Sequence, residues 1–474
     1  MYEFGYLIRG GITMRRLKFR FALFVGKTIM TLSKILPGVS GTTWPGGIAN
    51  IIDKNFAKNF RFKSDARIVM VTGTSGKTTT TGMLAQLVES EGKKICTNAI
   101  GANMDRGIST TFIKNSDMSG NVDADYIVLE VDERYLPLMT KQVKPHVILV
   151  TNILKDQSQR NGEPGVIMKK VSSALSDDIH LILNRDEPNT TSFGVGKKSV
   201  SYYGVADERV TDANTEDKNA ITSPFSVACS CPVCGGTITY DYENILNIGK
   251  FKCNKCNLKS EENAVIVSSD KKNMTINSLD KSYKVKYISN DFLYCYASLL
   301  AFAKHEGFSD KSIQQSINDF KIQSGRVEKM KVGDKTINYL RIKQETPVTL
   351  QSAINVATAD EEEKIVVLDL SEIVDFSPHY TGMYYAYDCD FGKFKNNNVI
   401  KYICMSNVVC YDAATRLALE GVDTKDIVVL PTDNYDLLLK ELEKYECKNV
   451  YLLTWMHSYY SCLNSVEKYN KVKG

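Results

Sequence analysis

The sequence predicts an α/β protein: a parallel sheet with a nucleotide-binding loop and an inserted four-cysteine zinc ribbon, followed by a smaller α/β domain. Three observations support this: a strand, glycine loop and helix over residues 68–91, two Cys-x-x-Cys pairs within residues 231–256, and new β-branched runs from residue 364. The 474 residues are about three times the ~150 residues typical of one domain. The composition, 43% hydrophobic and 24% charged, is that of a folded protein. The net charge of +4 is too small to indicate a nucleic-acid-binding protein.

Residues 1–60 are expected to form a helical and turn segment. Arg15 and Arg16 precede apolar residues, as in a secretory signal, but Arg20 and Lys27 interrupt the apolar run. No run of about 18 apolar residues occurs, which argues against a membrane-spanning helix. We therefore expect an amphipathic helix that caps the next domain. A helix that lies on an anionic membrane surface is the alternative.

The domain expected over residues 61–330 begins with a phosphate-binding loop. Residues 68–71 have the pattern of a buried strand, and a helical pattern follows the loop. Gly73 and Gly76 let backbone amides turn toward a phosphate at the positive end of this helix. Lys77 can reach the β- and γ-phosphates of a nucleotide, and the Thr78 hydroxyl can bind Mg²⁺. The ATP-binding residues expected in the loop are Gly73, Thr74, Ser75, Gly76, Lys77, Thr78 and Thr79.

Further strand patterns follow along this domain. They occur at residues 126–130, 146–150 and 180–184, and helical stretches separate them. Strands that alternate with helices favour a parallel sheet with helices on both faces.

The loop and four later motifs together resemble the Mur ligase family. The loop has that family's short Gly-Thr-x-Gly-Lys-Thr form, with Val71 where a general P-loop has glycine. The later motifs are Leu-Glu-Val-Asp-Glu at 129–133, Thr-Asn-Ile-Leu-Lys-Asp-Gln at 151–157, Asn-Arg-Asp-Glu-Pro at 184–188 and Gly-Arg-Val-Glu at 325–328. Mur ligases phosphorylate a carboxylate with ATP and let an amine attack the acyl phosphate.

The resemblance implies further site residues. Glu130 ends a strand where the family places a Mg²⁺-binding glutamate, so it is expected to bind Mg²⁺ together with Thr78. A carboxylate at the carboxyl end of a parallel strand also faces the nucleotide crevice. Asn184 and Arg326 are expected to belong to the ATP site.

The two Cys-x-x-Cys pairs form a candidate metal centre. Eighteen residues separate the pair Cys231 and Cys234 from the pair Cys253 and Cys256. Each pair can turn tightly with both thiolates inward, so the four can bind Zn²⁺ in a closed, structural site; a redox cluster is the alternative. Cys229 is expected to be a neighbour that does not bind the metal. Acidic residues in this ribbon, expected over 225–265, argue against nucleic-acid binding.

The ribbon's position after the Asn-Arg-Asp-Glu-Pro loop resembles the MurT family, the ligase-like subunits of lipid II isoglutaminyl synthase. Residues 97–108 also follow that family's T-N-x-x-G-[AS]-N-[ML]-x-R-G-I pattern. The resemblance implies ATP- and Mg²⁺-dependent amidation of the D-Glu α-carboxylate of the lipid II stem peptide to D-isoglutamine, in bacterial peptidoglycan synthesis. Ammonia would come from a GatD-like glutaminase subunit in a heterodimer, since no glutaminase domain is evident in the chain. The resemblance places this reaction in the cytoplasm, at the inner face of the membrane. It leaves open whether the chain makes peripheral contact with the membrane.

Residues 331–474 are expected to form the smaller α/β domain. Strand patterns at 365–369, 400–404, 427–430 and 450–454 alternate with helical stretches at 412–420 and 434–445. In MurT proteins this domain docks the glutaminase.

Two stretches depart from the MurT pattern. The family motif D-x-S-W-[IL]-W-D-x-D-F places its first Asp, which is thought to complete the glutaminase's Cys–His pair, on Gly382. Asp375 or Asp388 can supply this acid, or no residue does. The asparagines that the family places near Tyr294 and Ala297, beside the adenine, are absent. A diverged, non-catalytic scaffold or regulator is therefore the alternative function.

Overall fold

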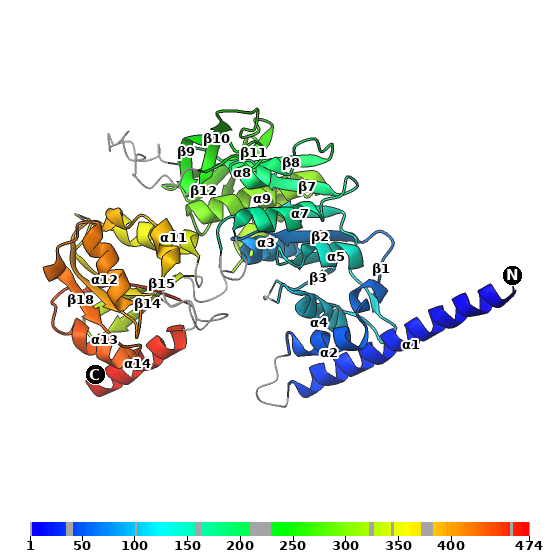
Figure 1. The fold of residues 1–474 in the computed structure, drawn as a ribbon, viewed down its shortest axis with the longest axis horizontal. Coiled ribbons are helices and arrows are strands. Elements are labelled where there is room, and N and C mark those ends of the chain that lie inside the picture. The colour runs from blue at the N-terminus through cyan, green and yellow to red at the C-terminus, as the bar shows by residue number, and fades with distance from the viewer. Residues whose placement is uncertain are drawn as a thin grey trace. The chain divides into compact units, whose positions relative to one another are not determined.

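The chain divides into two compact units (Figure 1). The first contains Met1–Leu154, Pro164–Asn214 and Ala228–Lys321, and the second contains Lys155–Glu163, Thr215–Val227 and Ile322–Gly474. The computed structural model describes residues 2–34, 41–99, 102–156, 163–208, 229–245, 247–321, 327–342, 346–370, 383–395, 397–455 and 458–473.

A nine-stranded sheet forms the centre of the first unit. Its strands are β2 (Arg67–Thr72), β3 (Ile95–Thr97), β5 (Tyr126–Glu130), β6 (Val147–Val150), β7 (His180–Asn184), β8 (Val200–Val205), β11 (Ala264–Asp270), β12 (Thr275–Ser278) and β13 (Lys281–Lys284). Their order is β13-β12-β11-β8-β7-β6-β2-β5-β3. The seven strands from β11 to β3 in this order pair in parallel. Strand β12 pairs antiparallel with both of its neighbours, β11 and β13. The predicted parallel sheet and its four predicted strands are confirmed.

Helices cover both faces of this sheet. One face packs against α3 (Lys77–Ser90) and α9 (Asn290–Glu306), with α10 (Asp310–Asp319) beside α3. The other packs against α4 (Asp105–Asn115), α5 (Leu136–Gln142) and α7 (Pro164–Ser172). Successive strand residues point to opposite faces, so buried apolar runs such as Ile68–Val71 supply both cores. The loops at the carboxyl ends of the strands are thereby left free to build a site.

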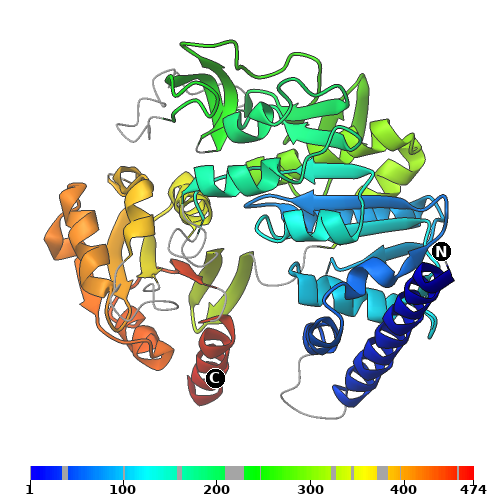
Figure 2. The ribbon, with the colours of Figure 1, turned by 45° about the vertical axis from the view of Figure 1, so that its right-hand side comes forward.

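A long helix lies along one side of the first unit. This helix, α1 (Tyr2–Leu32), packs on α2 (Trp44–Ile52) and α4. Figure 2 shows α1 as the long dark-blue helix. Phe19 and Leu23 enter the core there beside η1 (Phe56–Asn59). Nearby, β1 (Arg61–Phe62) pairs with β4 (Asn121–Val122). Among the described residues, no helix combines the length and apolar character needed to cross a membrane.

The four-cysteine segment folds as a separate small ribbon. Its strands β9 (Ile238–Ile245) and β10 (Ile248–Cys253) pair antiparallel. The ribbon is inserted between β8 and β11, which pair directly with each other in the large sheet. The insertion therefore extends the domain without breaking its sheet.

The second unit contains a six-stranded sheet. Its strands are β14 (Val327–Val332), β15 (Lys335–Ile342), β16 (Lys364–Asp369), β17 (Val399–Met405), β18 (Ile427–Leu430) and β19 (Asn449–Trp455). Their order is β14-β15-β19-β16-β17-β18, and only β14 is antiparallel to its neighbour. The four strands predicted here are confirmed.

Helices sandwich this second sheet as well. One face carries α11 (Pro347–Ala359) and α12 (Cys410–Leu419), together with η3 (Tyr384–Asp388) and η4 (Phe391–Phe394). The other carries α13 (Tyr435–Leu442) and α14 (Tyr459–Lys473). The predicted smaller α/β domain is therefore confirmed as a fold.

Candidate nucleotide site and four-cysteine centre

The phosphate-binding loop joins β2 to α3 with two glycines in conformations that other residues rarely adopt. Gly73 has φ +126° and Gly76 has φ +82°. A Cβ atom on Gly73 would lie 2.2 Å from Thr151 Oγ1 and 2.7 Å from the Asn152 carbonyl oxygen. Only glycine therefore lets the loop pass this close to the end of β6, the neighbouring strand in the sheet. Helix α3 begins at Lys77, so its first amides lie at the loop, as the sequence predicts.

The segment after β6 fixes the shape of this loop. The Asn152 side chain accepts a hydrogen bond from Ser75 N at 2.9 Å and donates to the Ser75 carbonyl at 3.2 Å. The Asn152 carbonyl accepts from Thr74 N at 2.8 Å. The Thr74 hydroxyl accepts from Leu154 N at 3.0 Å. The loop is thus held in one conformation from outside, which pre-organises it for a ligand.

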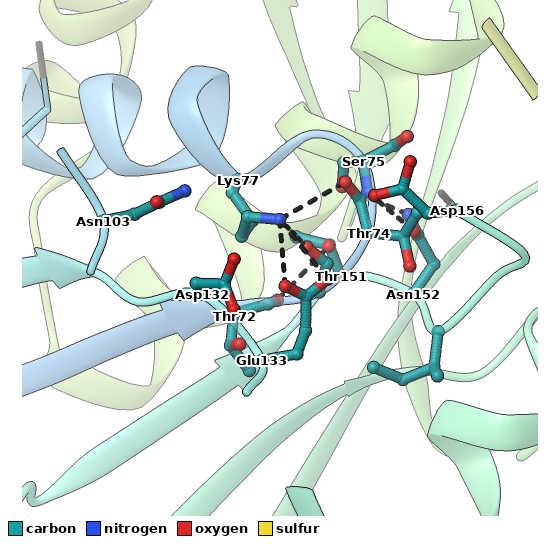
Figure 3. A network of polar contacts seen from close by, with 12 residues as sticks. Thr72, Thr74, Ser75, Lys77, Asn103, Asp132, Glu133, Thr151, Asn152 and Asp156 are labelled. Carbon is teal, nitrogen blue, oxygen red and sulfur yellow. Dashed lines mark hydrogen bonds and ion pairs between the residues drawn. The ribbon is translucent and has the colours of Figure 1, made fainter. Parts of the chain in front are cut away.

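Lys77 is buried and its ammonium is held inside the loop (Figure 3). Lys77 Nζ donates to the Gly73 carbonyl and lies 3.4 Å from both carboxylate oxygens of Glu133. Both side chains are about nine-tenths buried. A phosphate that bound this ammonium would compete with the Glu133 carboxylate. The ion pair keeps the buried charge neutralised in the absence of a nucleotide.

Glu130 presents a buried carboxylate oxygen at the end of β5. Asn98 brackets its backbone, accepting from Glu130 N at 2.8 Å and donating to Glu130 O at 2.9 Å. Asn103 Nδ2 donates to Glu130 Oε1 at 2.9 Å, and Oε2 has no hydrogen-bond partner among the described residues. A buried, unpartnered carboxylate oxygen is costly unless a cation or donor meets it. This residue therefore fits a hard divalent cation such as Mg²⁺.

The Asn-Arg-Asp-Glu-Pro loop holds the segment after β6, which in turn holds the phosphate loop. Asn184 Nδ2 donates to the Thr151 carbonyl at 3.1 Å, and its Oδ1 accepts from Asp186 N at 3.0 Å. Glu187 caps α8 (Pro188–Ser192) and accepts from Ile153 N at 3.0 Å. Burial raises the pKa of the Glu187 carboxyl. The amide of Asn184 therefore holds the strand end that carries Thr151.

Tyr294 lies on helix α9, close to a position at which the MurT pattern has asparagine. Its hydroxyl donates to Asp186 Oδ2 at 3.1 Å, and that oxygen also accepts from Val205 N at 2.8 Å. Burial raises the pKa of the Asp186 carboxyl. The ribbon reaches the same loop, because Gly249 N donates to Asp186 O at 2.8 Å. Tyr294 thus anchors α9 to this loop, which the ribbon also contacts.

The four cysteines converge at the end of the ribbon. All four Sγ atoms lie within 4.8 Å of one another, with Cys231 to Cys256 at 3.6 Å and Cys234 to Cys253 at 3.5 Å. Tetrahedral Zn–S bonds of about 2.3 Å place sulfurs about 3.8 Å apart, so the set fits a Zn²⁺ ion. The amides of Lys255 and Cys256 donate to Cys253 Sγ at 3.3 and 3.4 Å and lower the pKa of that thiol to about 6. The spacing of the four sulfurs therefore allows one metal ion to bind all of them as thiolates.

The remaining site predictions concern Arg326, Asp375 and Asp388. Arg326 and Asp375, like Gly382, lie outside the described residues. Asp388 ends η3 in the second unit and forms an ion pair with Lys155 at 2.9 Å. Its role as an acid for a partner's histidine stays a prediction.

Three residues of the site were not singled out from the sequence. They are Glu133, which pairs with Lys77, Asn103, which holds Glu130, and Asn152, which holds Ser75. All three lie within motifs that resemble the Mur ligases or MurT, so the motifs could have marked these residues as candidates. Their partners were not, since each contact joins segments at least 27 residues apart.

A nucleotide-type loop, a buried carboxylate and a parallel sheet are the features of the Mur ligase fold, and comparison with known proteins agrees. The Mur ligase middle domain model matches residues 71–248. A pseudomurein peptide ligase type C from Methanothermus fervidus superposes with a TM-score of 0.64 at 19% identity, covering 89% of this chain and 84% of that one. The MurF ligase from Thermotoga maritima, solved in complex with ADP, superposes with a TM-score of 0.55 at 14% identity, covering 89% and 84%. The chain thus has the Mur ligase fold.

The second unit indicates which proteins with the Mur ligase fold this chain resembles. The MurT ligase C-terminal model matches residues 344–458. The MurT subunit of the glutamine-hydrolyzing lipid II isoglutaminyl synthase of Staphylococcus aureus is 27% identical over 414 residues, 86% of this chain and 89% of the relative. The corresponding Streptococcus pneumoniae subunit is 26% identical over 434 residues, 87% and 89%. The two domain matches and these relatives together support a member of the MurT family.

Proposed function

We propose that this chain is the ATP-using subunit of a lipid II isoglutaminyl synthase. It would convert the D-Glu α-carboxylate of the lipid II stem peptide to the amide of D-isoglutamine, with ammonia from a GatD-like glutaminase subunit. The observation that carries the proposal is the buried Glu130 Oε2, which has no hydrogen-bond partner in the described part of the chain and lies beside a pre-organised phosphate loop. The names of the MurT relatives support the choice of substrate and donor.

The chain's own residues fit the first half of this reaction. The γ-phosphoryl group passes from ATP to a carboxylate oxygen and leaves ADP and an acyl phosphate. The amides of the loop and the Lys77 ammonium would hold the phosphates and offset negative charge as it develops. Glu130 and Thr78 would hold Mg²⁺, which supplies further charge neutralisation at the phosphates.

The second half needs ammonia rather than a second amino acid. Ammonia attacks the acyl carbon, inorganic phosphate leaves, and the nitrogen loses one proton. The match of the second unit to the MurT C-terminal model favours this step over peptide ligation. The family's glutaminase would deliver the ammonia, with Asp375 or Asp388 as the candidate acid for its histidine.

The test separates the chain from its partner by supplying ammonium chloride directly. The chain, lipid II, ATP, Mg²⁺ and ammonium are incubated, and mass spectrometry detects replacement of the carboxyl hydroxyl by an amino group. We expect ADP and amidated lipid II to form in equal amounts. Glutamine should replace ammonium only after the glutaminase subunit is added.

Variants assign the chemistry to the loop. Lys77→Ala and Glu130→Gln should abolish amidation, and Lys141→Ala, an exposed lysine on α5, should leave it unchanged. Full turnover by Lys77→Ala would refute the mechanism. Failure to bind millimolar ATP would refute the proposal and favour the scaffold alternative.

A further inference from the structure

Helix α1 carries an exposed stripe of large apolar side chains. Met14, Leu17, Phe21 and Phe24 are 74%, 68%, 59% and 56% exposed. Their spacing of three and four residues places them on one face of the helix. We call these four residues the α1 stripe.

The opposite face of the same helix is firmly packed. Phe19, Ala22 and Leu23 are buried, and Phe19 contacts the Phe56 and Phe60 rings at 5.3 and 5.1 Å between centroids. Lys27 Nζ donates to the Ile113 and Ser116 carbonyls at 2.9 and 2.7 Å. The helix therefore cannot rotate to bury the α1 stripe without losing this core.

Basic side chains border the α1 stripe on both sides. At 3.6 residues per turn, Lys18 falls next to Met14 on one side, while Arg16 and Arg20 fall beyond Phe24 on the other. All three are exposed. No Asp or Glu occurs between residues 14 and 34. The surface thus combines an apolar strip with positive borders.

We propose that α1 docks on an anionic phospholipid membrane, with the α1 stripe in the interface and its basic borders on the headgroups. An apolar face flanked by Lys and Arg is suited to lie in the plane of such a surface. A second copy of the chain fits less well, because residues 14–34 of its α1 segment would bring the same positive charges and no carboxylate to pair with them. The proposal concerns docking only and does not rest on the proposed reaction.

Co-sedimentation of the full chain with vesicles tests the docking. Vesicles of phosphatidylglycerol and phosphatidylcholine are compared with vesicles of phosphatidylcholine alone. We expect binding to the anionic vesicles, weakened by raising the salt from 0.1 M to 0.5 M, as screening of charge at a surface requires. The phosphatidylcholine vesicles should bind far less.

Paired variants separate the apolar and the basic contributions. Phe21→Gln with Phe24→Gln, and separately Arg16→Gln with Arg20→Gln, should each weaken binding about tenfold or more. The matched controls are Val195→Gln with Leu419→Gln, both exposed apolar residues, and Lys284→Gln with Lys311→Gln, both exposed lysines. The controls should bind like the parent chain, and circular dichroism should show that every variant is folded.

Either of two kinds of vesicle result, or one result without vesicles, would overturn the inference. The two vesicle results are equal binding by the parent chain and the Phe21 and Phe24 double variant, and no binding by the parent. The result without vesicles is a parent chain that sediments as a dimer and becomes a monomer in that double variant. The α1 stripe would then be an interface between copies.

Discussion

Replacing Gly73 by alanine should disrupt the phosphate loop far more than the same change at Gly76. At Gly73 the φ of +126° alone costs an alanine on the order of 1–3 kcal/mol. The new Cβ would also lie 2.2 Å from Thr151 Oγ1, 2.7 Å from Asn152 O and 2.9 Å from Asn152 N. Two of these three atoms are backbone, so a side-chain rotation cannot relieve the overlap.

The backbone of Asn152 cannot retreat cheaply. Its carbonyl accepts from Thr74 N, and its side chain makes two hydrogen bonds to Ser75. Each such bond contributes about 1 kcal/mol. The strain and the loss of one or two of these bonds together lower the free energy of unfolding of the first unit by roughly 2–5 kcal/mol.

Gly76→Ala is the matched control. Its φ of +82° costs an alanine about 1 kcal/mol, and the nearest atom to the new Cβ, Cys295 Sγ, is 3.7 Å away. Urea denaturation gives the two free energies, and hydrogen exchange of the β2 amides assigns the transition to the first unit. ATP titration should show no binding by Gly73→Ala. The reasoning fails if the two variants differ by less than about 1 kcal/mol.

Three further outcomes are expected. Asn103→Ala should weaken the apparent Mg²⁺ affinity in ATP turnover about 10-fold or more, because Glu130 loses the donor that orients it; an unchanged Mg²⁺ titration would contradict this. Cys256→Ser, or chelation of the ribbon's metal, should weaken ATP binding severalfold, because the ribbon supports the Asp186 loop; restoration by added zinc checks the chelated sample. Asp369 is buried in the second unit, and this burial raises the pKa of its carboxyl from 3.8 to about 6. The protonated carboxyl stabilises the fold fully below pH 4. The free energy of unfolding then falls by about 3 kcal/mol as the pH rises through 6. Asp369→Asn should therefore gain stability over the parent chain between pH 4.5 and pH 7.5, and parallel pH profiles of unfolding free energy would disprove the assignment.

Elements with a local signature could be predicted from the residues alone. The strand, loop and helix at 68–91 were predictable, because the glycine positions and the helix start are short-range requirements of the backbone. The cysteine spacing likewise predicted four convergent sulfurs, since each Cys-x-x-Cys turn is local. Four strands in each sheet followed from buried, β-branched runs.

Which side chains meet depends on the assembled fold. Glu133 lies 56 residues from Lys77 in the sequence, and Tyr294 lies 108 from Asp186. The first pair forms because parallel strands bring their carboxyl ends to one edge of the sheet, and the second because α9 packs against β7 and β8. No window of sequence contains either arrangement. The same holds for α1: its sequence allowed either a capping helix or a surface helix, and packing of Phe19 and Leu23 fixed which apolar residues stay exposed. Burial is a property of the assembled fold, so only the structure could separate the core face of that helix from the α1 stripe.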